Sequence, residues 1–189
     1  MAARNRLPPW HERLRLLDGR DMLIRPIRPE DAVPLRASLC LLKPDAIRLR
    51  CLQACKDRGV DLAEWMTRPD LRHEFALVAA EPYPPGEAVV SAVARAAVVT
   101  GDRDRRDGSN ARDADFDIMV SDHIAGQGMG RHLMQRLVRW GRAKRLRRLQ
   151  GDLAEPNAPM LLLARSLGFR RAQQSTQGLV RVVLELQPA

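Results

Sequence analysis

The chain has little of what several protein classes require. Aromatic residues make up only 4% of its 189 residues, too few for the stacking platforms that bind single-stranded nucleic acids. No apolar run approaches the roughly 20 residues that span a bilayer. The N-terminus is basic but has no apolar h-region, so we expect no secretory signal and predict a cytoplasmic location.

Cysteine is also scarce. Cys40, Cys51 and Cys55 are an odd number of thiols with no C-x-x-C spacing, so we interpret them as reduced, half-buried thiols. The four histidines show no metal-ligand spacing with them, and no metal is expected. Acidic residues are outnumbered, and the net charge of +9 favours an anionic ligand or an acidic partner surface. Charge alone does not indicate nucleic acid, which we do not expect as a partner.

The apolar pattern predicts a mixed α/β domain, with antiparallel hairpins first and a β-α-β unit after them. Strands are expected at 21–27, 73–81, 87–100, 114–122, 147–153 and 178–186. Helices are expected at 28–42, 43–59, 60–70, 127–145 and 157–169, and an exposed hairpin loop at 101–113. Residues 1–17 are expected to be a basic N-terminal extension, within a polar lead-in that ends near residue 19. Residues 18–189 are expected to form a single domain.

The most distinctive stretch is "DHIAGQGMGRHLMQRL", residues 122–137, which places three glycines against the start of an amphipathic helix. A glycine-rich turn before a helix N-terminus can bind an anion, because backbone N–H groups and the helix dipole face the ligand. The spacing of Gly126, Gly128 and Gly130 fits neither the dinucleotide fingerprint nor the phosphate loop. A tight turn alone is the alternative interpretation.

The order of the pieces carries a resemblance. The glycine loop (residues 125–130), its helix, the next strand and "NAPMLLLARSLGF" (157–169) together resemble the GNAT superfamily of acetyl-CoA-dependent N-acetyltransferases. The superfamily loop is written [QR]-x-x-G-x-[GA] and here reads "AGQGMG". Both glycines match, whereas Ala125 replaces the usual Gln or Arg, which removes a side-chain contact and leaves the backbone cradle.

Two further segments, "DGRDMLIRPIRPEDAVPLRASL" and "ADFDIMVSD", look like the Pat-type protein lysine acetyltransferase domain. The similarity covers roughly residues 18–170, and such domains occur alone or fused to acyl-CoA-synthetase-like modules. It implies the GNAT fold, an α/β (α+β) arrangement in which helices flank a mixed, mostly antiparallel sheet of six to seven strands. It also implies acetyl-CoA as the acyl donor.

The resemblance implies a donor site at the end of the strand before the loop and in the loop itself. The residues implied are Met119, Val120, Ala125, Gly126, Gln127, Gly128, Met129, Gly130, Arg131 and Asn157. Asn157 is also a good N-cap for the following helix, so it can serve as cap, cofactor contact or both. The apolar pair Met119 and Val120 breaks the period-two alternation of the strand, which predicts a β-bulge there.

The implied chemistry is attack of an amine on a thioester. A lysine amine has a pKa of about 10.4, so a carboxylate must take its proton, directly or through water. Asp115 stands where Pat-like domains have a glutamate, and the shorter side chain favours a water relay. Asp117 is expected on the same strand face, where two neighbouring carboxylates would raise one pKa. The alternative is a solvated acidic edge.

Many GNAT enzymes protonate the leaving thiolate with a tyrosine, which is Ala164 here, and the chain's only tyrosine is Tyr83. The predicted function is acetyl transfer from acetyl-CoA to a protein lysine by direct attack in a ternary complex. The acceptor protein would be of the acyl-CoA synthetase kind. Two alternatives stay open. One is N-acetylation of a small-molecule amine, and the other is a catalytically weak acyl-CoA-binding regulatory module.

Overall fold

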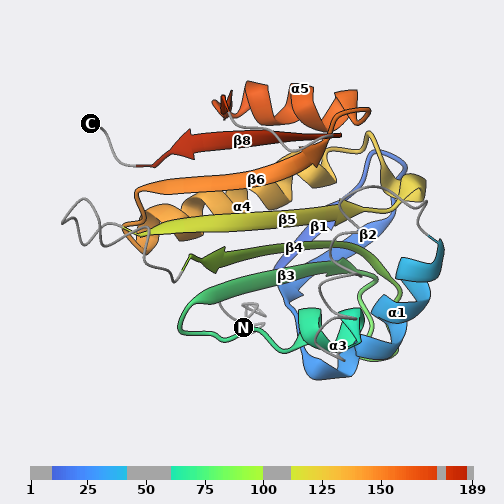
Figure 1. Ribbon diagram of the computed structural model, residues 1–189. Helices are drawn as coiled ribbons and strands as arrows, with labels where there is room; N and C mark the ends of the chain where they lie inside the picture. The colour runs from blue at the N-terminus through green and yellow to red at the C-terminus, as the bar shows by residue number, and fades with distance from the viewer. Residues whose placement is uncertain (1–9, 42–60, 100–111, 174–177, 187–189) are drawn as a thin grey trace, which may run out of the picture.

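The computed structural model describes residues 10–41, 61–99, 112–173 and 178–186. Within them lies an eight-stranded sheet in the order β1-β2-β3-β4-β5-β6-β8-β7 (Figure 1). Every neighbouring pair is antiparallel except β5 and β6, which are parallel. The predicted mixed, mostly antiparallel sheet is confirmed, with more strands than the six or seven expected.

Two of the eight strands were not predicted. The strands are β1 (Glu12–Arg15), β2 (Asp21–Pro26), β3 (Glu74–Ala80), β4 (Val90–Val98), β5 (Asp113–Val120), β6 (Arg148–Ala154), β7 (Arg170–Arg171) and β8 (Leu179–Glu185). The lead-in expected up to residue 19 is wrong for β1, which pairs with β2 from Glu12↔Ile24 to Arg15↔Asp21. Both missed strands are short, polar edge strands, and edge strands carry little apolar alternation.

The helices lie within the predicted segments, except for one short helix at 122–124 that was not predicted. They are η1 (Pro29–Asp31), α1 (Ala32–Leu41), α3 (Leu62–Thr67), η2 (Asp122–Ile124), α4 (Met129–Ala143) and α5 (Ala158–Ser166). The helix expected at 43–59, with Cys51 and Cys55, lies outside the described residues, as does most of the loop expected at 101–113. No helix in the described ranges combines the length and apolar character needed to cross a membrane. The cytoplasmic location stays a prediction.

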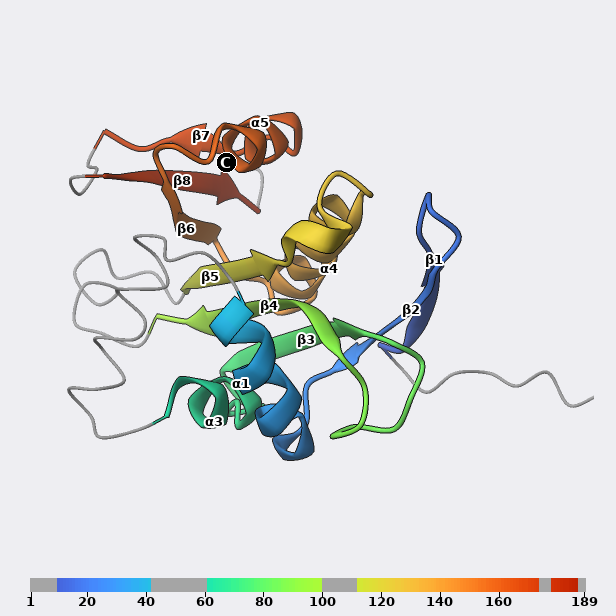
Figure 2. The ribbon, with the colours of Figure 1, turned by 90° about the vertical axis from the view of Figure 1, so that its right-hand side faces the viewer.

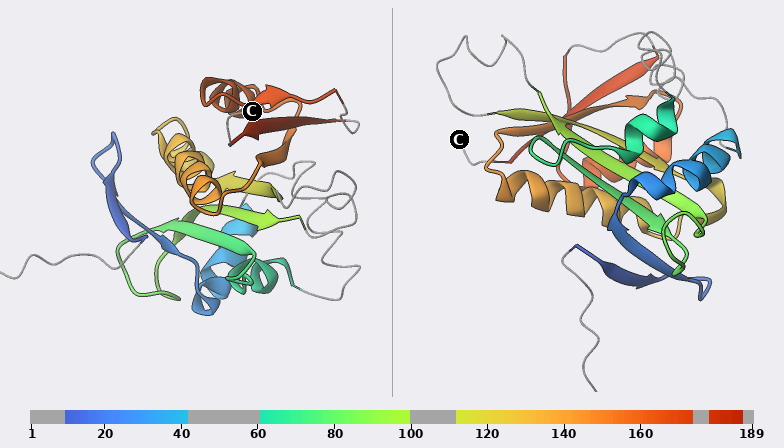
Figure 3. Two further views of the ribbon diagram at one scale, coloured as in Figure 1. Left: turned by 90° about the vertical axis from the view of Figure 1, so that its left-hand side faces the viewer. Right: turned by 90° about the horizontal axis from the view of Figure 1, so that it is seen from below.

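Helices lie on both faces of the sheet (Figures 2 and 3), and a separate apolar core lies beneath them on each face. On one face α4 and α5 pack on the strands, and α4 contributes Leu133, Met134 and Leu137, which are fully buried. On the other face α1 and α3 cover β3 and β4, with Leu35 and Met66 among the buried residues. This second core stops short of β6 and β8, whose strands on that face carry charged side chains.

A buried ion pair explains part of the "IRPIRPED" segment. The guanidinium of Arg25 in β2 donates two hydrogen bonds of 2.7 Å to the carboxylate of Asp31. Asp31 also accepts from the backbone N–H of Arg28 at 2.9 Å. Both side chains are almost fully buried, at 2% and 0% exposed. The motif therefore fixes the start of α1 against the sheet.

Candidate active site

The sheet opens between its two parallel strands. β5 and β6 pair only at Asp113↔Arg148, Ala114↔Leu149 and Asp115↔Gln150. Beyond these pairs β5 stays on β4 as far as Val120, and β6 stays on β8 as far as Ala154. The two halves of the sheet thus separate at a fork, which we define as the end of the Asp115↔Gln150 pairing.

One aromatic ring and one glycine form the base of this fork. A Cβ on Gly151 of β6 would lie 2.7 Å from the ring of Phe116 and 2.8 Å from its carbonyl oxygen. Phe116 in turn packs edge-on against Phe169, with ring centroids 5.4 Å apart. Only glycine leaves room here for β6 to pass so close to β5.

The bulge predicted at Met119 and Val120 is wrong. The β4–β5 register is continuous from Val98↔Ala114 to Ala92↔Val120, and a register shift lies instead between Ala79 and Ala80 of β3, opposite β4. The alternation in β5 in fact continues. Val120 faces the α4 core, and Met119 faces the α1 core. Met119 is apolar at an otherwise acidic set of positions because α1 covers the sheet there.

A cleft of about 440 Å³ lies where β5 ends, on the α4 and α5 side. It is lined by Ile118, Val120, Asp122, Ile124, Ala125, Gly126, Gly128, Gly130, Arg131, Asn157, Pro159, Met160 and Leu163. Seven of the ten residues predicted to bind the donor are in this set. The other three are placed elsewhere: Met119 lies on the opposite face, Met129 is the buried first residue of α4, and the Gln127 side chain is hydrogen-bonded to Asp18.

The glycine loop has the backbone of an anion site. Gly126 and Gly128 have φ values of +74° and +86°, which side-chain-bearing residues rarely adopt. Gly128 is the N-cap of α4, and no side chain within the described ranges caps this helix. The first N–H groups of a 15-residue helix are therefore open to the cleft, where the dipole favours negative charge. This geometry fits the diphosphate of acetyl-CoA.

Two predicted donor contacts have protein partners of their own. Arg131 donates to the Ser166 hydroxyl at 2.8 Å, and that hydroxyl donates to the Leu163 carbonyl at 2.7 Å. Asn157 is the N-cap of α5, where its side-chain oxygen accepts from the Met160 N–H at 3.2 Å. Both residues still line the cleft, so the cap and the cofactor contact are compatible at Asn157.

The predicted catalytic carboxylates point to the other face of the sheet. Asp115 and Asp117 alternate with the core residues Phe116 and Ile118, so they share the face of Met119. Asp115 is half exposed and belongs to the last β5–β6 pair, at the fork itself. The cleft and the two carboxylates thus lie on opposite faces of the sheet, both along β5.

Sequence reasoning missed the charged neighbours of Asp115. Arg181 of β8 lies 3.8 Å from an Asp115 oxygen and donates two hydrogen bonds, of 2.8 and 2.7 Å, to the largely buried Asp152 of β6. The hydrogen bond to Asp152 raises the pKa of Arg181 above its ordinary value, and the charge of Asp115 adds to the effect. The available signal was the presence of Asp152 and Arg181 among the apolar residues of the strands expected at 147–153 and 178–186.

Asp117 lies directly opposite Arg95 of β4. Arg95 is buried, forms an ion pair with Glu74 and lies over the Trp65 ring of α3, 3.8 Å from its centroid. Carboxylates and guanidinium groups therefore alternate across this face.

In the parts of the chain that the structure describes, no cluster of three or more His, Cys, Asp or Glu side chains could hold a metal ion.

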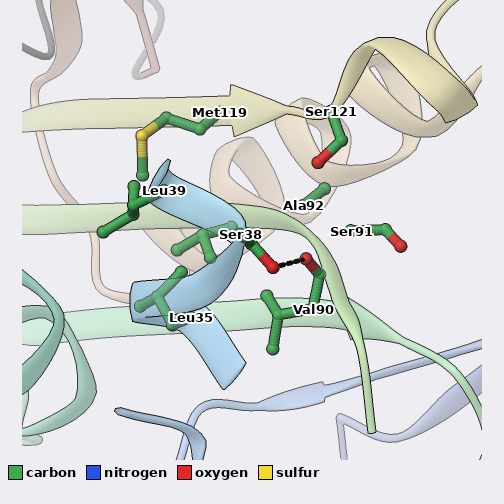
Figure 4. Close-up of a pocket in the computed structure, with 9 residues that line it drawn as sticks. Leu35, Ser38, Leu39, Val90, Ser91, Ala92, Met119 and Ser121 are labelled. Carbon is green, nitrogen blue, oxygen red and sulfur yellow. Dashed lines mark hydrogen bonds between the residues drawn. The ribbon is translucent and has the colours of Figure 1, made fainter. Parts of the chain in front are cut away.

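A second hollow lies on the face of the sheet that carries Asp115 and Asp117, between α1 and strands β4 and β5 (Figure 4). Leu35 and Leu39 of α1 and Met119 of β5 line it, and the Ser38 hydroxyl donates to the Val90 carbonyl at 2.7 Å beside it. Its volume of about 10 Å³ holds one water molecule at most.

Comparison with known proteins agrees with this geometry. Residues 61–169 match the model of the acetyltransferase (GNAT) family. The GNAT domain of S. lividans Pat superposes with a TM-score of 0.69 at 20% identity, over 96% of this chain and all of that domain. YncA of Salmonella typhimurium, solved with its cofactor acetyl-CoA, gives 0.61 at 24% identity, over 89% of this chain and 95% of that one.

A cAMP-binding acyltransferase from Mycobacterium smegmatis gives a TM-score of 0.57 at 18% identity. The match covers 94% of this chain but spans only 48% of that one. At such identities the structural likenesses show the fold, whereas the family model matches more than half of the sequence. The chain belongs to the acetyltransferase (GNAT) family, and the predicted acetyl-CoA-dependent N-acetyltransferase is confirmed at this level.

Proposed function

We propose that this acetyltransferase acts on the side-chain amine of a protein lysine, with an acyl-CoA synthetase as the kind of protein acetylated. One observation carries the proposal. β5 parts from β6 just beyond Asp115, and the donor cleft begins three residues further along the same strand, at Ile118. The described helices leave the Asp115 face uncovered over β6 and β8, and Asp115 and Glu185 are about half exposed. A lysine on a protein surface can reach such a face.

The chain's own groups have two tasks once the donor supplies its acyl thioester. Asp115 or Asp117 accepts the proton that the amine loses as its nitrogen bonds to the carbonyl carbon, and a water molecule spans the remaining distance. Backbone N–H groups at the end of β5 stabilise the charge on the carbonyl oxygen. A thiol pKa of about 8.5 lets the CoA thiolate leave without full protonation, so Ala164 in place of tyrosine is tolerated.

The donor half is tested by thermal unfolding with and without acetyl-CoA, with ATP as the anion control. Donor at about 100 times its Kd adds roughly 2.7 kcal/mol of stability. For a chain of this size the melting temperature should rise by about 5 to 10 °C. An equal rise with ATP would reduce the glycine loop to a generic anion site.

The acceptor half is tested by transfer to a purified acyl-CoA synthetase. Asp115→Asn and Asp117→Asn should show which carboxylate matters, with a fall in kcat of about 100-fold or more for the proton acceptor. KM for acetyl-CoA should hardly change, because both side chains face away from the donor cleft. The matched control is Glu87→Gln, an exposed carboxylate in the β3–β4 loop, which should leave both constants unchanged.

A small cationic amine is the second candidate acceptor, favoured by the carboxylates of Asp115, Asp117 and Asp152 on one face of the sheet. Turnover of a polyamine but not of the protein would select this function. Donor binding without transfer to either acceptor would indicate an acyl-CoA-binding regulatory module instead.

A further inference from the structure

The glycine loop is held from outside by a segment more than a hundred residues away in the sequence. The turn between β1 and β2 contains Asp18 and Arg20. The backbone N–H of Asp18 donates to the side-chain oxygen of Gln127 at 3.2 Å, and the Gln127 amide donates back to the Asp18 carboxylate at 2.6 Å. Gln127 lies between the two left-handed glycines of the loop.

The same turn also holds the chain just before the loop. Arg20 donates to the backbone carbonyl of His123 at 2.8 Å. Its guanidinium also donates twice to the Asp18 carboxylate, at 2.8 and 2.6 Å. The contact of Asp18 with Gln127 and that of Arg20 with His123 are therefore linked to each other. These hydrogen bonds, with that of Arg20 first, hold the pKa of Asp18 well below its usual range. The carboxylate therefore stays ionised and able to accept at neutral pH.

We propose that Asp18 and Arg20 are positioning residues that latch the donor loop through Gln127 and His123, so that its N–H groups are pre-arranged for the diphosphate of acetyl-CoA. The latch rests on the donor role of the loop. It assigns a different function to the Gln127 side chain, which binds the hairpin, whereas the donor is left to the backbone. Neither Asp18 nor Arg20 lines the donor cleft.

A loop of this composition needs such a support. Three glycines in five residues cost conformational entropy when the loop becomes ordered, and the donor would otherwise bear that cost on binding. Ala125 offers no side chain that could fix the loop from within. The hairpin is itself anchored, because Glu12 of β1 accepts from His132 and Arg136 of α4. The latch thus connects the glycine loop, through the β1–β2 hairpin, to α4, the helix that follows the loop.

The negative charge of Asp18 makes the direction of the change in donor affinity informative. Removal of a carboxylate beside an anion site strengthens anion binding if the carboxylate acts only through its charge. The latch requires the opposite result for Asp18→Ala. Asp21→Ala is the matched control, since Asp21 is an exposed carboxylate at the start of β2 that makes no side-chain bond with the described loop residues.

The experiment measures kcat, KM and the Kd of acetyl-CoA for Asp18→Ala, Gln127→Ala, the double variant and Asp21→Ala. Gln127→Ala loses both hydrogen bonds, and Asp18→Ala loses the one to the carboxylate but keeps the one from the backbone N–H. Kd and KM should rise about fivefold to tenfold in each single variant, with kcat little changed. The double variant should be no worse than either single one, because both remove the same contact. Asp18→Asn keeps an acceptor for Gln127 and should recover part of the affinity.

Hydrogen exchange of the amides at 123–130 in the free protein gives a readout that needs no donor. The latch predicts faster exchange there in both single variants and unchanged exchange in the β3 and β4 amides. Unchanged exchange, or donor binding in Asp18→Ala as tight as in Asp21→Ala, would overturn the latch. A wild-type protein that binds no acetyl-CoA would instead overturn the donor role, and the exchange result would still decide whether the loop is latched.

Discussion

Gly151→Ala should be the most disruptive alanine substitution at any glycine of the described chain, because of what a Cβ would meet there. The new methyl group would lie 2.7 Å from the Phe116 ring and 2.8 Å from the Phe116 carbonyl oxygen. Neither group can move alone. The ring packs against Phe169, and the carbonyl belongs to β5, which is paired along its length with β4. The strain has to be relieved by displacement of β5 from β6.

Such overpacking typically costs about 1 to 3 kcal/mol, and a backbone obstacle places this site at the upper end. For about 3 kcal/mol in a domain of this size, the melting temperature should fall by roughly 6 to 12 °C. Because the displaced strands form the fork, acetyl-CoA should also bind more weakly to the variant.

Gly141→Ala is the matched comparison. A Cβ there would lie even closer to its nearest neighbour, at 2.6 Å, but that neighbour is a terminal methyl of Leu186. A flexible side-chain end can rotate away, and alanine gains about 1 kcal/mol over glycine in a helix interior. Urea unfolding should therefore place Gly141→Ala within about 1 kcal/mol of the wild type. Equal losses in the two variants, or a fully stable Gly151→Ala, would refute the distinction between backbone and side-chain obstacles.

Two further predictions concern ion pairs. Asp31→Ala leaves the Arg25 charge buried without its carboxylate, and urea unfolding should show a loss of about 3 to 5 kcal/mol. The hydrogen bond from Arg36 lowers the pKa of Asp61, the N-cap of α3. A lowered folded-state pKa stabilises the fold above the unfolded value of about 3.9, so this contribution should disappear as the pH falls through the folded pKa. Unfolding between about pH 5 and pH 2 should show a shallower acid loss in Asp61→Asn.

The parts of the fold that the sequence predicts are those with local signals. α4 was found from its apolar period and its glycines, and α5 from Asn157 and Pro159 at its start. β1 and β7 were missed because an edge strand need not bury one face. The predicted bulge was wrong because a change from Asp117 to Met119 looks like a break in alternation. In the structure it marks where α1 begins to cover the strand, and no local pattern encodes that.

The site divides in the same way. The glycine loop could be predicted from the sequence because its backbone conformation requires glycine, at Gly126 and Gly128. The sequence does not show which residues the side chains of the site contact. Arg181 lies 3.8 Å from Asp115 although they are far apart in the chain, and Gln127 pairs with Asp18 across the domain. A pairing between distant strands leaves no periodic trace in one sequence, so these neighbours become visible only in the fold.

The two departures from the superfamily pattern affect different steps of the reaction. Ala125 lies in the glycine loop, where the proposed cradle is made of backbone N–H groups that no substitution of that side chain removes. Ala164 is buried in α5, so the tyrosine hydroxyl that would protonate the thiolate is absent from its usual position. Donor binding should therefore be preserved, and any loss of rate should fall on proton transfer.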